Sequence, residues 1–190
     1  LGKVAKLNSL IQAPFHLHEK IMALINEEAD YATAGGEAWI KARMNSLIEP
    51  EVIKALYRAS QAGVQIDLVV RGACALKPGI PGISENIRIK SVMGRFLEHP
   101  RIFAFFAQGQ EKVYLASADW MPRNFFKRLE LVFPIRSKKL KAKVMEEGIE
   151  TYLADNQGSW ELLPNTQYSK IIVDETPHSA QQWLLEKYGY

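Results

Sequence analysis

The chain has 190 residues, 47% of them hydrophobic and 24% charged, a composition that excludes a disordered protein and predicts one folded domain, or one with a small appendage. No apolar run approaches the roughly 18 residues that cross a bilayer, no signal-peptide pattern begins the chain, and one cysteine excludes an internal disulfide, so we expect a soluble protein of a reducing cytoplasm. The net charge of +3 conceals an asymmetry, because residues 71–143 hold 15 Lys or Arg against 5 Asp or Glu. This local excess of positive charge predicts a surface that faces a polyanion. Residues 136–143 also fit a solvated basic helix.

The first third of the chain alternates between helical and strand patterns. Apolar residues recur at helical spacing over residues 11–34, which predicts a helix that ends at the Gly pair 35–36. A strand is predicted over 38–44, a second amphipathic helix over 51–62 and an apolar strand over 64–70. Strand, helix and strand with short connections predict two parallel neighbours joined by a right-handed crossover.

The middle of the chain reads as a loop followed by strands. Residues 72–82 are rich in Gly and Pro and predict an ordered loop, after which 87–92 predicts a short strand. Two strands over 101–107 and 112–118, around a Gly-containing connection, predict a hairpin, and 129–135 predicts one more strand.

The last part of the chain contains two helical patterns. A helix over 138–155 can cover a sheet face, and 180–188 fits a terminal helix. The fold class is therefore α/β, with a mixed, partly parallel sheet and helices on its faces. The residues of the long helix expected to face the sheet are Leu140, Val144, Ile149 and Leu153.

A polar patch is predicted at one end of the hairpin. His99 and Arg101 are two residues apart and would point to the same side of a strand. A hairpin symmetric about 109–110 places them beside Ser117 and Asp119. An imidazole oriented by a carboxylate, next to a guanidinium that can bind phosphate oxygens, suits phosphoryl chemistry. The alternative is a histidine that is simply hydrogen-bonded at a strand end.

Other candidate phosphate ligands follow the predicted parallel strands. Arg71 lies at the carboxyl end of the strand over 66–70, where open α/β sheets bind ligands, unless it forms an ordinary surface ion pair. Asn45 ends the first strand and can bond phosphate or cap a turn. Arg123 and Arg128 belong to the basic region and can equally be solvated charges. The four scattered histidines show no metal-ligand spacing, so no metal site is predicted.

Seven segments resemble bacterial polyphosphate kinase, the enzyme that transfers the terminal phosphate of ATP to a growing polyphosphate chain. Together they span about residues 12–156, whereas the tail from Gln157 resembles the family weakly. The segments are 13–15 (APF), 44–47 (MNSL), 55–64 (ALYRASQAGV), 78–82 (PGIPG), 84–88 (SENIR), 94–99 (GRFLEH) and 117–124 (SADWMPRN).

The resemblance implies a domain organisation. In this family two phospholipase D-like domains surround the active site, and the chain resembles the second of them. Residues 1–36 would then be a linking helix from the missing preceding domain, 37–156 the phospholipase D-like phosphate-binding domain and 157–190 a C-terminal tail. The phosphorylated histidine, the Mg²⁺ ligands and part of the nucleotide site would lie outside this chain. Within it, Arg71 and His99 match the family's ATP-binding positions.

The resemblance also implies an activity and partners. The chain would be the C-terminal catalytic domain of an ATP–polyphosphate phosphotransferase, inactive alone, with ATP and Mg²⁺ used by the complete enzyme. The implied partners are polyphosphate, the preceding domains of the same polypeptide and further copies in a homo-oligomer. Nucleic acid is disfavoured because the aromatic residues lack the even spacing of a base-stacking platform. The implied location is the cytoplasm, including the inner face of the membrane.

Three departures from related patterns bear on the chemistry. Arg43 stands where the family usually has Lys, and the His-x-Lys and Gly-Ser-x-Asn patterns of phospholipase D relatives read here His99-x-Arg101 and Ala116-Ser117-Ala118-Asp119. Arginine favours bidentate phosphate binding, and Asp119 adds a negative charge beside His99, so both changes disfavour phospholipid cleavage. Two alternatives stay open: a phospholipase D-type phosphodiesterase that pairs two copies of His99 in a dimer, and a non-catalytic polyanion-binding module.

Overall fold

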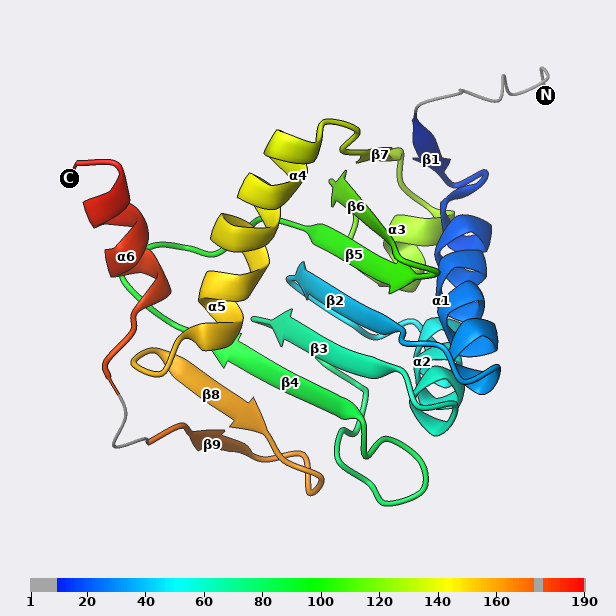
Figure 1. Cartoon of the computed structure of the whole chain (residues 1–190), viewed down its shortest axis with the longest axis horizontal. Helices are drawn as coiled ribbons and strands as arrows, with labels where there is room; N and C mark the ends of the chain where they lie inside the picture. The colour runs from blue at the N-terminus through cyan, green and yellow to red at the C-terminus, as the bar shows by residue number, and fades with distance from the viewer. Residues whose placement is uncertain (1–9, 173–175, 190) are drawn as a thin grey trace.

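Short strands from the whole length of the chain build one mixed sheet in the computed structural model, which describes residues 10–172 and 176–189 (Figure 1). The strands lie in the order β1-β7-β6-β5-β2-β3-β4-β8-β9. Among the described residues, β2 pairs with β3 and β3 with β4 in parallel, and the other neighbouring strands are antiparallel, which confirms the mixed, partly parallel sheet. Their bounds are β1 (Ile11–Ala13), β2 (Trp39–Met44), β3 (Gln65–Val70), β4 (Ile87–Val92), β5 (Ile102–Ala107), β6 (Gln110–Ala116), β7 (Glu130–Pro134), β8 (Ser159–Leu162) and β9 (Tyr168–Lys170).

Helices cover both faces of this sheet. The helices α1 and α2 pack on one face, and α4, η1 and α5 run as one rod across the other, with α6 beside it (Figure 1). Their bounds are α1 (Leu17–Thr33), α2 (Pro50–Gln61), α3 (Pro122–Phe126), α4 (Lys138–Met145), the π-helical turn η1 (Glu146–Glu150), α5 (Thr151–Ala154) and α6 (Ala180–Lys187). No helix in the described ranges has the length and apolar character needed to span a membrane.

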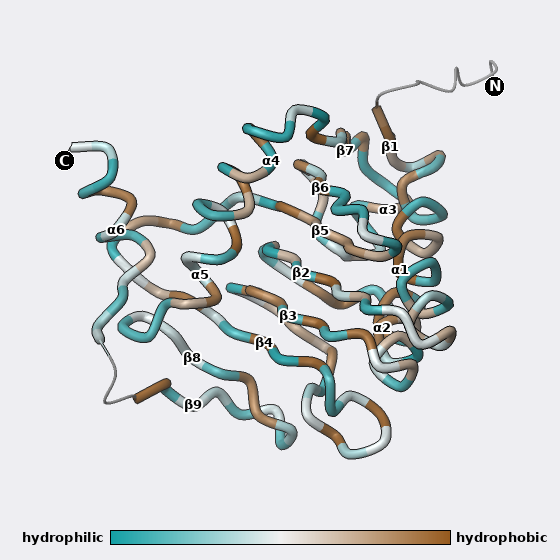
Figure 2. Tube along the Cα trace, in the orientation of Figure 1, coloured by the Kyte–Doolittle hydropathy of each residue, from teal (hydrophilic) through white to brown (hydrophobic). Residues whose placement is uncertain are grey.

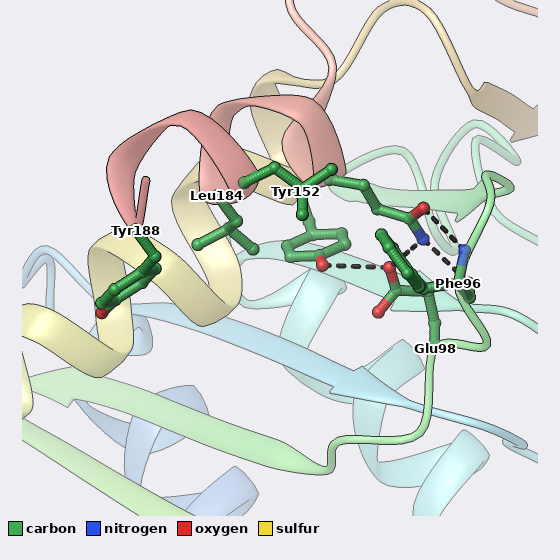
Figure 3. A pocket seen from close by; sticks show the side chains of 7 residues that line it. Phe96, Glu98, Tyr152, Leu184 and Tyr188 are labelled. Atoms are coloured by element: carbon green, nitrogen blue, oxygen red, sulfur yellow. Dashed lines mark hydrogen bonds between the residues drawn. The ribbon is translucent and has the colours of Figure 1, made fainter. Parts of the chain in front are cut away.

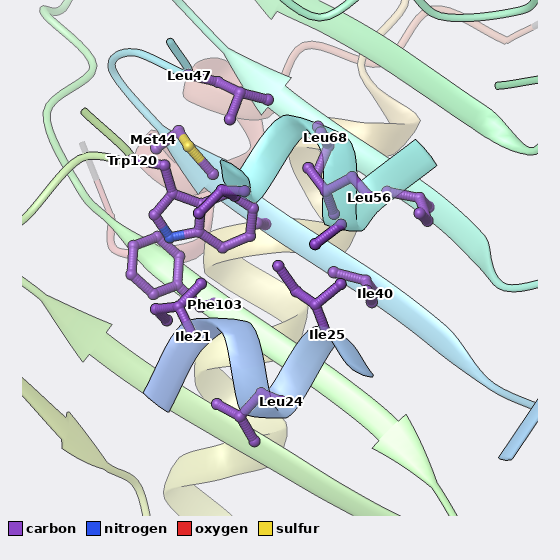
Figure 4. Packing of buried hydrophobic residues seen from close by; sticks show 14 of the residues in the cluster. Ile21, Leu24, Ile25, Ile40, Met44, Leu47, Leu56, Leu68, Phe103 and Trp120 are labelled. Carbon is purple, nitrogen blue, oxygen red and sulfur yellow. The ribbon is translucent and has the colours of Figure 1, made fainter. Parts of the chain in front are cut away.

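The main core lies between the sheet and the pair α1 and α2. Alternate strand residues such as Ile40 and Phe103 face this side, where they meet Ile25 of α1 and Leu56 of α2 (Figure 4). Along the strands, apolar stretches alternate with polar positions (Figure 2). The opposite face holds a smaller apolar cluster that includes Ile102 and residues of α4 and η1. Burial on both faces fixes the register of each central strand, because a shift of one residue would exchange the two faces.

The unit β2-α2-β3 forms as predicted. Pro50 occupies the first turn of α2, and Glu49 caps it by accepting a bond from the Val52 amide at 2.6 Å. The strands pair in parallel from Trp39 opposite Gln65 to Met44 opposite Val70. The first strand of the hairpin, β5, lies antiparallel on the other side of β2. The carboxyl ends of β2, β3 and β4 therefore meet the start of β5 at one end of the sheet.

Two predicted elements need correction, and three elements were missed. The helix predicted over 11–34 begins at Leu17, because Ala13 precedes Pro14 and takes an extended conformation, so that residues 11–13 form β1 instead. The hairpin turns at Gln108 and Gly109, with φ of 54° and 68°, one residue earlier than the predicted centre. The strands β8 and β9 and the short helix α3 were not predicted.

The long helix forms over the predicted residues, but Leu140 does not cover the sheet. Its side chain is 55% exposed, whereas Val144 and Ile149 pack in the second cluster. These two residues are five apart and share a face because the π turn η1 adds one residue to the helical repeat. The division of the chain at residues 36 and 156 stays a prediction; in the structure all three parts contribute strands or helices to the same layers.

One charged residue is buried in α1 without compensation. Glu28 is 0% exposed, and neither of its carboxylate oxygens has a hydrogen-bond partner among the described residues. Burial, and then the neighbouring charge of Glu27, raise its pKa from 4.5 to about 7. The folded protein therefore holds a proton on Glu28 that the unfolded chain releases at lower pH.

This proton predicts a pH dependence of stability. The contribution is fully present below about pH 4.5 and is lost as the pH rises through about 7, because only the unfolded chain is then free to ionise at little cost. We expect Glu28→Gln to be more stable than the wild type above pH 7, by on the order of 2 kcal/mol, and nearly equal to it near pH 4.5. Urea unfolding of both proteins across this range measures the difference. The exposed residue Glu19 of the same helix serves as the control, and a Glu19→Gln difference of equal size would contradict the assignment.

Candidate functional site

The predicted site residues lie at the sheet end where three parallel strands finish. Asn45 follows β2, Arg71 follows β3, and Asp119 follows β6 by three residues. His99 and Arg101 precede β5, so they are not strand residues, and Pro100 between them favours an extended backbone at His99.

Backbone bonds tie the three loops together beyond the ends of the strands. The amide of Leu47 donates to the Ala73 carbonyl at 2.9 Å, and that of Trp120 donates to the Ser46 carbonyl at 3.2 Å. Gly72 donates to the Asn45 carbonyl at 2.8 Å, and a side chain there would not fit, since a Cβ would lie 2.7 Å from that oxygen. The residues that carry the polar side chains are therefore held at fixed separations.

Four hydrogen-bonding steps link five of the predicted residues. Arg71 Nε donates to Asn45 Oδ1 at 2.7 Å, and the Asn45 backbone amide donates to Asp119 Oδ1 at 2.7 Å. Arg101 donates to the same carboxylate from Nε at 3.2 Å and from Nη2 at 3.1 Å. Its third nitrogen, Nη1, lies 3.0 Å from His99 Nδ1. We call this set, Arg71–Asn45–Asp119–Arg101–His99, the phosphate-site chain.

Burial differs along the phosphate-site chain. Asp119 is 4% exposed and Asn45 is 7% exposed, whereas His99 and Arg71 at the two ends are exposed. The buried carboxylate is compensated by the Arg101 guanidinium and by the amide groups of Asn45. Asn45, Asp119 and Arg101, at the centre of the phosphate-site chain, are thus a fixed support. The two end residues, His99 and Arg71, present an imidazole and a guanidinium to a ligand.

Three predicted residues lie outside the phosphate-site chain: Ser117, Arg123 and Arg128, of which Arg128 is exposed and takes part in none of these hydrogen bonds. Ser117 donates to the Glu130 carboxylate and accepts from the Leu131 amide at 3.0 Å. Arg101 pairs with Ala116, and Ser117, the next residue, points to the opposite face because neighbouring strand residues alternate. Arg123 is exposed on the first turn of α3 and takes part in none of these hydrogen bonds. The predicted placing of Ser117 beside His99 is therefore wrong.

A second group of polar residues beside the site was missed. Arg43, Glu98, Tyr152 and Gln181 bond to one another next to the loop that carries His99. Arg43 stood out only as a departure from a family pattern, and Glu98 only as the neighbour of His99. No sequence signal pairs Gln181, 83 positions away, with that loop.

The surface beside Arg71 is hollowed in two places. One hollow of about 350 Å³ is lined by Arg71, Ser91, Trp160 and Tyr168 among others, and one of about 290 Å³ lies along the loop from Val92 to Glu98. The described residues contain no group of three His, Cys, Asp or Glu side chains able to hold a metal ion. The arrangement thus offers positive charge and hydrogen-bond donors to an anion, and assigns no metal ligand.

The fold is that of a phospholipase D-like α/β domain. The crystal structure of Nuc, a phospholipase D family member from Salmonella typhimurium, superposes with a TM-score of 0.52 over 72% of this chain and 88% of the Nuc chain. The sequence identity is 16%, so this likeness concerns the fold alone. A model of the family "Polyphosphate kinase C-terminal domain 2" matches residues 10–182, and the chain belongs to the polyphosphate kinase family.

Individual relatives agree with this membership. The chain is 53% identical over 188 residues to the polyphosphate kinase of Burkholderia multivorans, an alignment that covers 99% of the chain and 27% of the relative. It is 50% identical to the polyphosphate kinase of Paraburkholderia phytofirmans over the same shares of the two chains. The crystal structure of polyphosphate kinase from Porphyromonas gingivalis superposes with a TM-score of 0.92 at 35% identity, over 98% of this chain and 29% of the other.

These comparisons confirm the family resemblance and correct one part of it. The matched range, residues 10–182, takes in most of the tail from Gln157, which we expected to resemble the family only weakly. None of the seven segments on which the resemblance rested lies in the tail. The chain spans about a quarter of the length of the curated relatives that it matches.

Proposed function

We propose that the chain is the C-terminal catalytic domain of a polyphosphate kinase, which transfers the terminal phosphate of ATP to polyphosphate. In this proposal the domain supplies phosphate-binding residues but not the phosphorylated histidine. The observation that carries the proposal is the phosphate-site chain, which holds Arg71 and His99 exposed at one sheet end in a protein 53% identical to a polyphosphate kinase.

The proposed roles follow from the chemistry of each side chain. His99 donates a hydrogen bond or a proton to a phosphate oxygen, and Arg71 neutralises charge on the same group. Arg101 orients the His99 ring, and Asp119 with Asn45 keeps both arginines in place. Catalysis is then positioning plus charge neutralisation, as is typical of phosphoryl transfer.

The proposal extends to the surroundings of the site. Arg123 and the rest of the basic region guide the polyphosphate chain. ATP and Mg²⁺ serve the complete enzyme, with the Mg²⁺ ligands outside this chain. The complete enzyme is a cytoplasmic homo-oligomer, peripheral to the inner membrane face, in which preceding domains of the same polypeptide complete the active site.

The isolated 190-residue chain is expected to be inactive. With ATP, Mg²⁺ and a polyphosphate primer it should form no detectable polyphosphate, because the nucleophile lies outside it; ³¹P NMR follows the product. A chimera in which the chain replaces the matched segment of the Burkholderia multivorans kinase should be active under the same conditions. Turnover by the isolated chain, or an inactive but folded chimera, would contradict the proposal.

Polyphosphate binding to the isolated chain is expected to be weak and salt-dependent. Exposed Lys and Arg side chains act through screened charge and counterion release, so the affinity should fall about tenfold or more between 50 and 200 mM salt. Fluorescence anisotropy with a labelled polyphosphate measures this slope. Single-stranded DNA of equal charge is the control, and a preference for DNA would instead support the nucleic-acid-binding alternative. Salt-independent binding would show that the basic region is not the contact surface.

A further inference from the structure

The loop that carries His99 has little support of its own. Residues 93–101 connect β4 to β5 without regular structure, and Met93, Phe96 and Leu97 are 67%, 47% and 74% exposed. A loop of this kind holds a catalytic side chain in one place only if other elements fasten it.

Glu98, the residue before His99, is the main anchor. Its carboxylate forms an ion pair with Arg43, which is 4% exposed. The same carboxylate accepts a hydrogen bond from the Tyr152 hydroxyl at 3.0 Å (Figure 3). The Arg43 guanidinium stacks 3.4 Å from the centre of the Tyr152 ring and donates to the Gly148 carbonyl at 3.0 Å. That carbonyl belongs to the π turn η1, where the helical bonding pattern is altered.

Gln181 of α6 closes the anchor from the other side. Its Oε1 accepts from the Phe96 amide at 2.9 Å, and its Nε2 donates to the Phe96 carbonyl at 2.9 Å and to Glu98 Oε1 at 2.5 Å. The glutamine therefore pairs with the loop backbone as a neighbouring strand would. Gly94 makes room for it, since a Cβ there would lie 2.4 Å from Gln181 Oε1. Gln181 is itself only 8% exposed.

The start of α6 is fastened to the long helix. Asp155 is 1% exposed, and its Oδ2 accepts from the Ala180 amide at 2.8 Å. His178 lies with Nε2 2.9 Å from the Thr151 hydroxyl, and its amide donates to Asn156 at 2.8 Å. The tail, for which the sequence suggested no role, thus places Gln181 against the loop.

We propose that Gln181 is a positioning residue of the kinase site, which acts through Glu98 and Phe96 to hold His99 against Arg101. This inference rests on the proposed function, because it needs His99 to act on phosphate. Asp155, His178 and Gln181 then serve catalysis without touching the substrate.

A double-mutant cycle in the active chimera tests the proposal. Gln181→Met keeps the length of the side chain and removes its hydrogen bonds, and we expect it to lower kcat/KM for ATP about tenfold, since small displacements of a catalytic group have large effects. Gln182→Met is the matched control, because Gln182 is exposed on the same helix and its side chain bonds, within the described part of the chain, only to Glu186 of that helix; it should leave the rate unchanged. Combined with His99→Ala, Gln181→Met should change the rate by less than about twofold, because coupled residues are not additive.

The outcomes separate the two proposals. An equal tenfold loss in both backgrounds, or no loss in either, would overturn the positioning role while leaving His99 as a site residue. A His99→Ala chimera of normal rate would overturn the proposed site itself. Gly94→Ala displaces the Gln181 side chain without altering α6, so it should lower kcat/KM as much as Gln181→Met does. This second variant tests the positioning role even if the Gln181→Met chimera folds poorly. Unfolding of each variant of the 190-residue chain supplies the folding control.

Discussion

Replacing His99 with Ala in the active chimera is expected to lower the rate of polyphosphate synthesis about 10²-fold or more, since a positioned proton or hydrogen-bond donor is lost. The fold should be nearly unaffected, because His99 is exposed and, among the described residues, its side chain bonds only to Arg101. We expect a stability change of about 0.5 kcal/mol or less in urea unfolding.

An arginine pair provides the matched control for this experiment. Arg71→Ala should lower the rate in the same way through lost charge neutralisation, whereas Arg88→Ala should not. Arg88 is equally exposed but lies at the start of β4, at the opposite end of the sheet, in an ion pair with Asp67. If His99→Ala unfolds the domain while the chimera keeps near-normal specific activity, His99 is structural. The phosphate site would then have to be sought around Asn45 and residues 72–82.

Removing the Asp119 carboxylate is expected to have the largest effect on stability. Asp119→Ala leaves the partly buried Arg101 guanidinium and the buried Asn45 amide without their acceptor, and breaking a buried pair of this kind costs about 3–5 kcal/mol. Asp119→Asn keeps one acceptor oxygen and should lose less. Urea unfolding of the 190-residue chain measures both changes.

The control for Asp119 is an ion pair at the surface. Asp67 bonds to Arg88 at 2.8 Å, but the arginine side chain is 71% exposed, so Asp67→Ala should cost no more than about 1 kcal/mol. Equal losses for Asp67→Ala and Asp119→Ala would show that Asp119 is not the support of the phosphate-site chain.

The central part of the fold could be predicted because local patterns determine it. The strand patterns of β2 and β3, the helical spacing of α2 and the short connections between them leave one arrangement, and the structure has it. The edges of the sheet could not be predicted in this way. Three residues at 11–13 carry no periodicity of their own, and they form β1 only because β7, more than a hundred positions later, offers an unpaired edge.

The site shows the same division. Asn45, Arg71 and Arg101 follow or precede strands whose ends must meet, so their proximity was predictable from topology. Ser117 follows Ala116, the partner of Arg101, so strand alternation directs its hydroxyl away from Arg101 and toward Glu130. A hairpin centred one residue later would pair Arg101 with Ala118 and leave Ser117 on that same opposite face. Gln181 depends on the packing of α6 against the loop before β5, which no local pattern encodes.

The order of the strands has a consequence for synthesis on the ribosome. The first strand, β1, pairs with β7 at residues 130–132, and the edge of β4 is covered by β8 at residues 159–161. A nascent chain that has released β1 through β6 therefore carries β1 unpaired and two uncovered sheet edges, at β6 and at β4, and all three wait for later residues. Exposed strand edges of this kind pair readily with other chains. Partly synthesised chains in which β6 has emerged and β7 has not are therefore expected to be prone to aggregate, and slow elongation between these two strands would prolong that exposure.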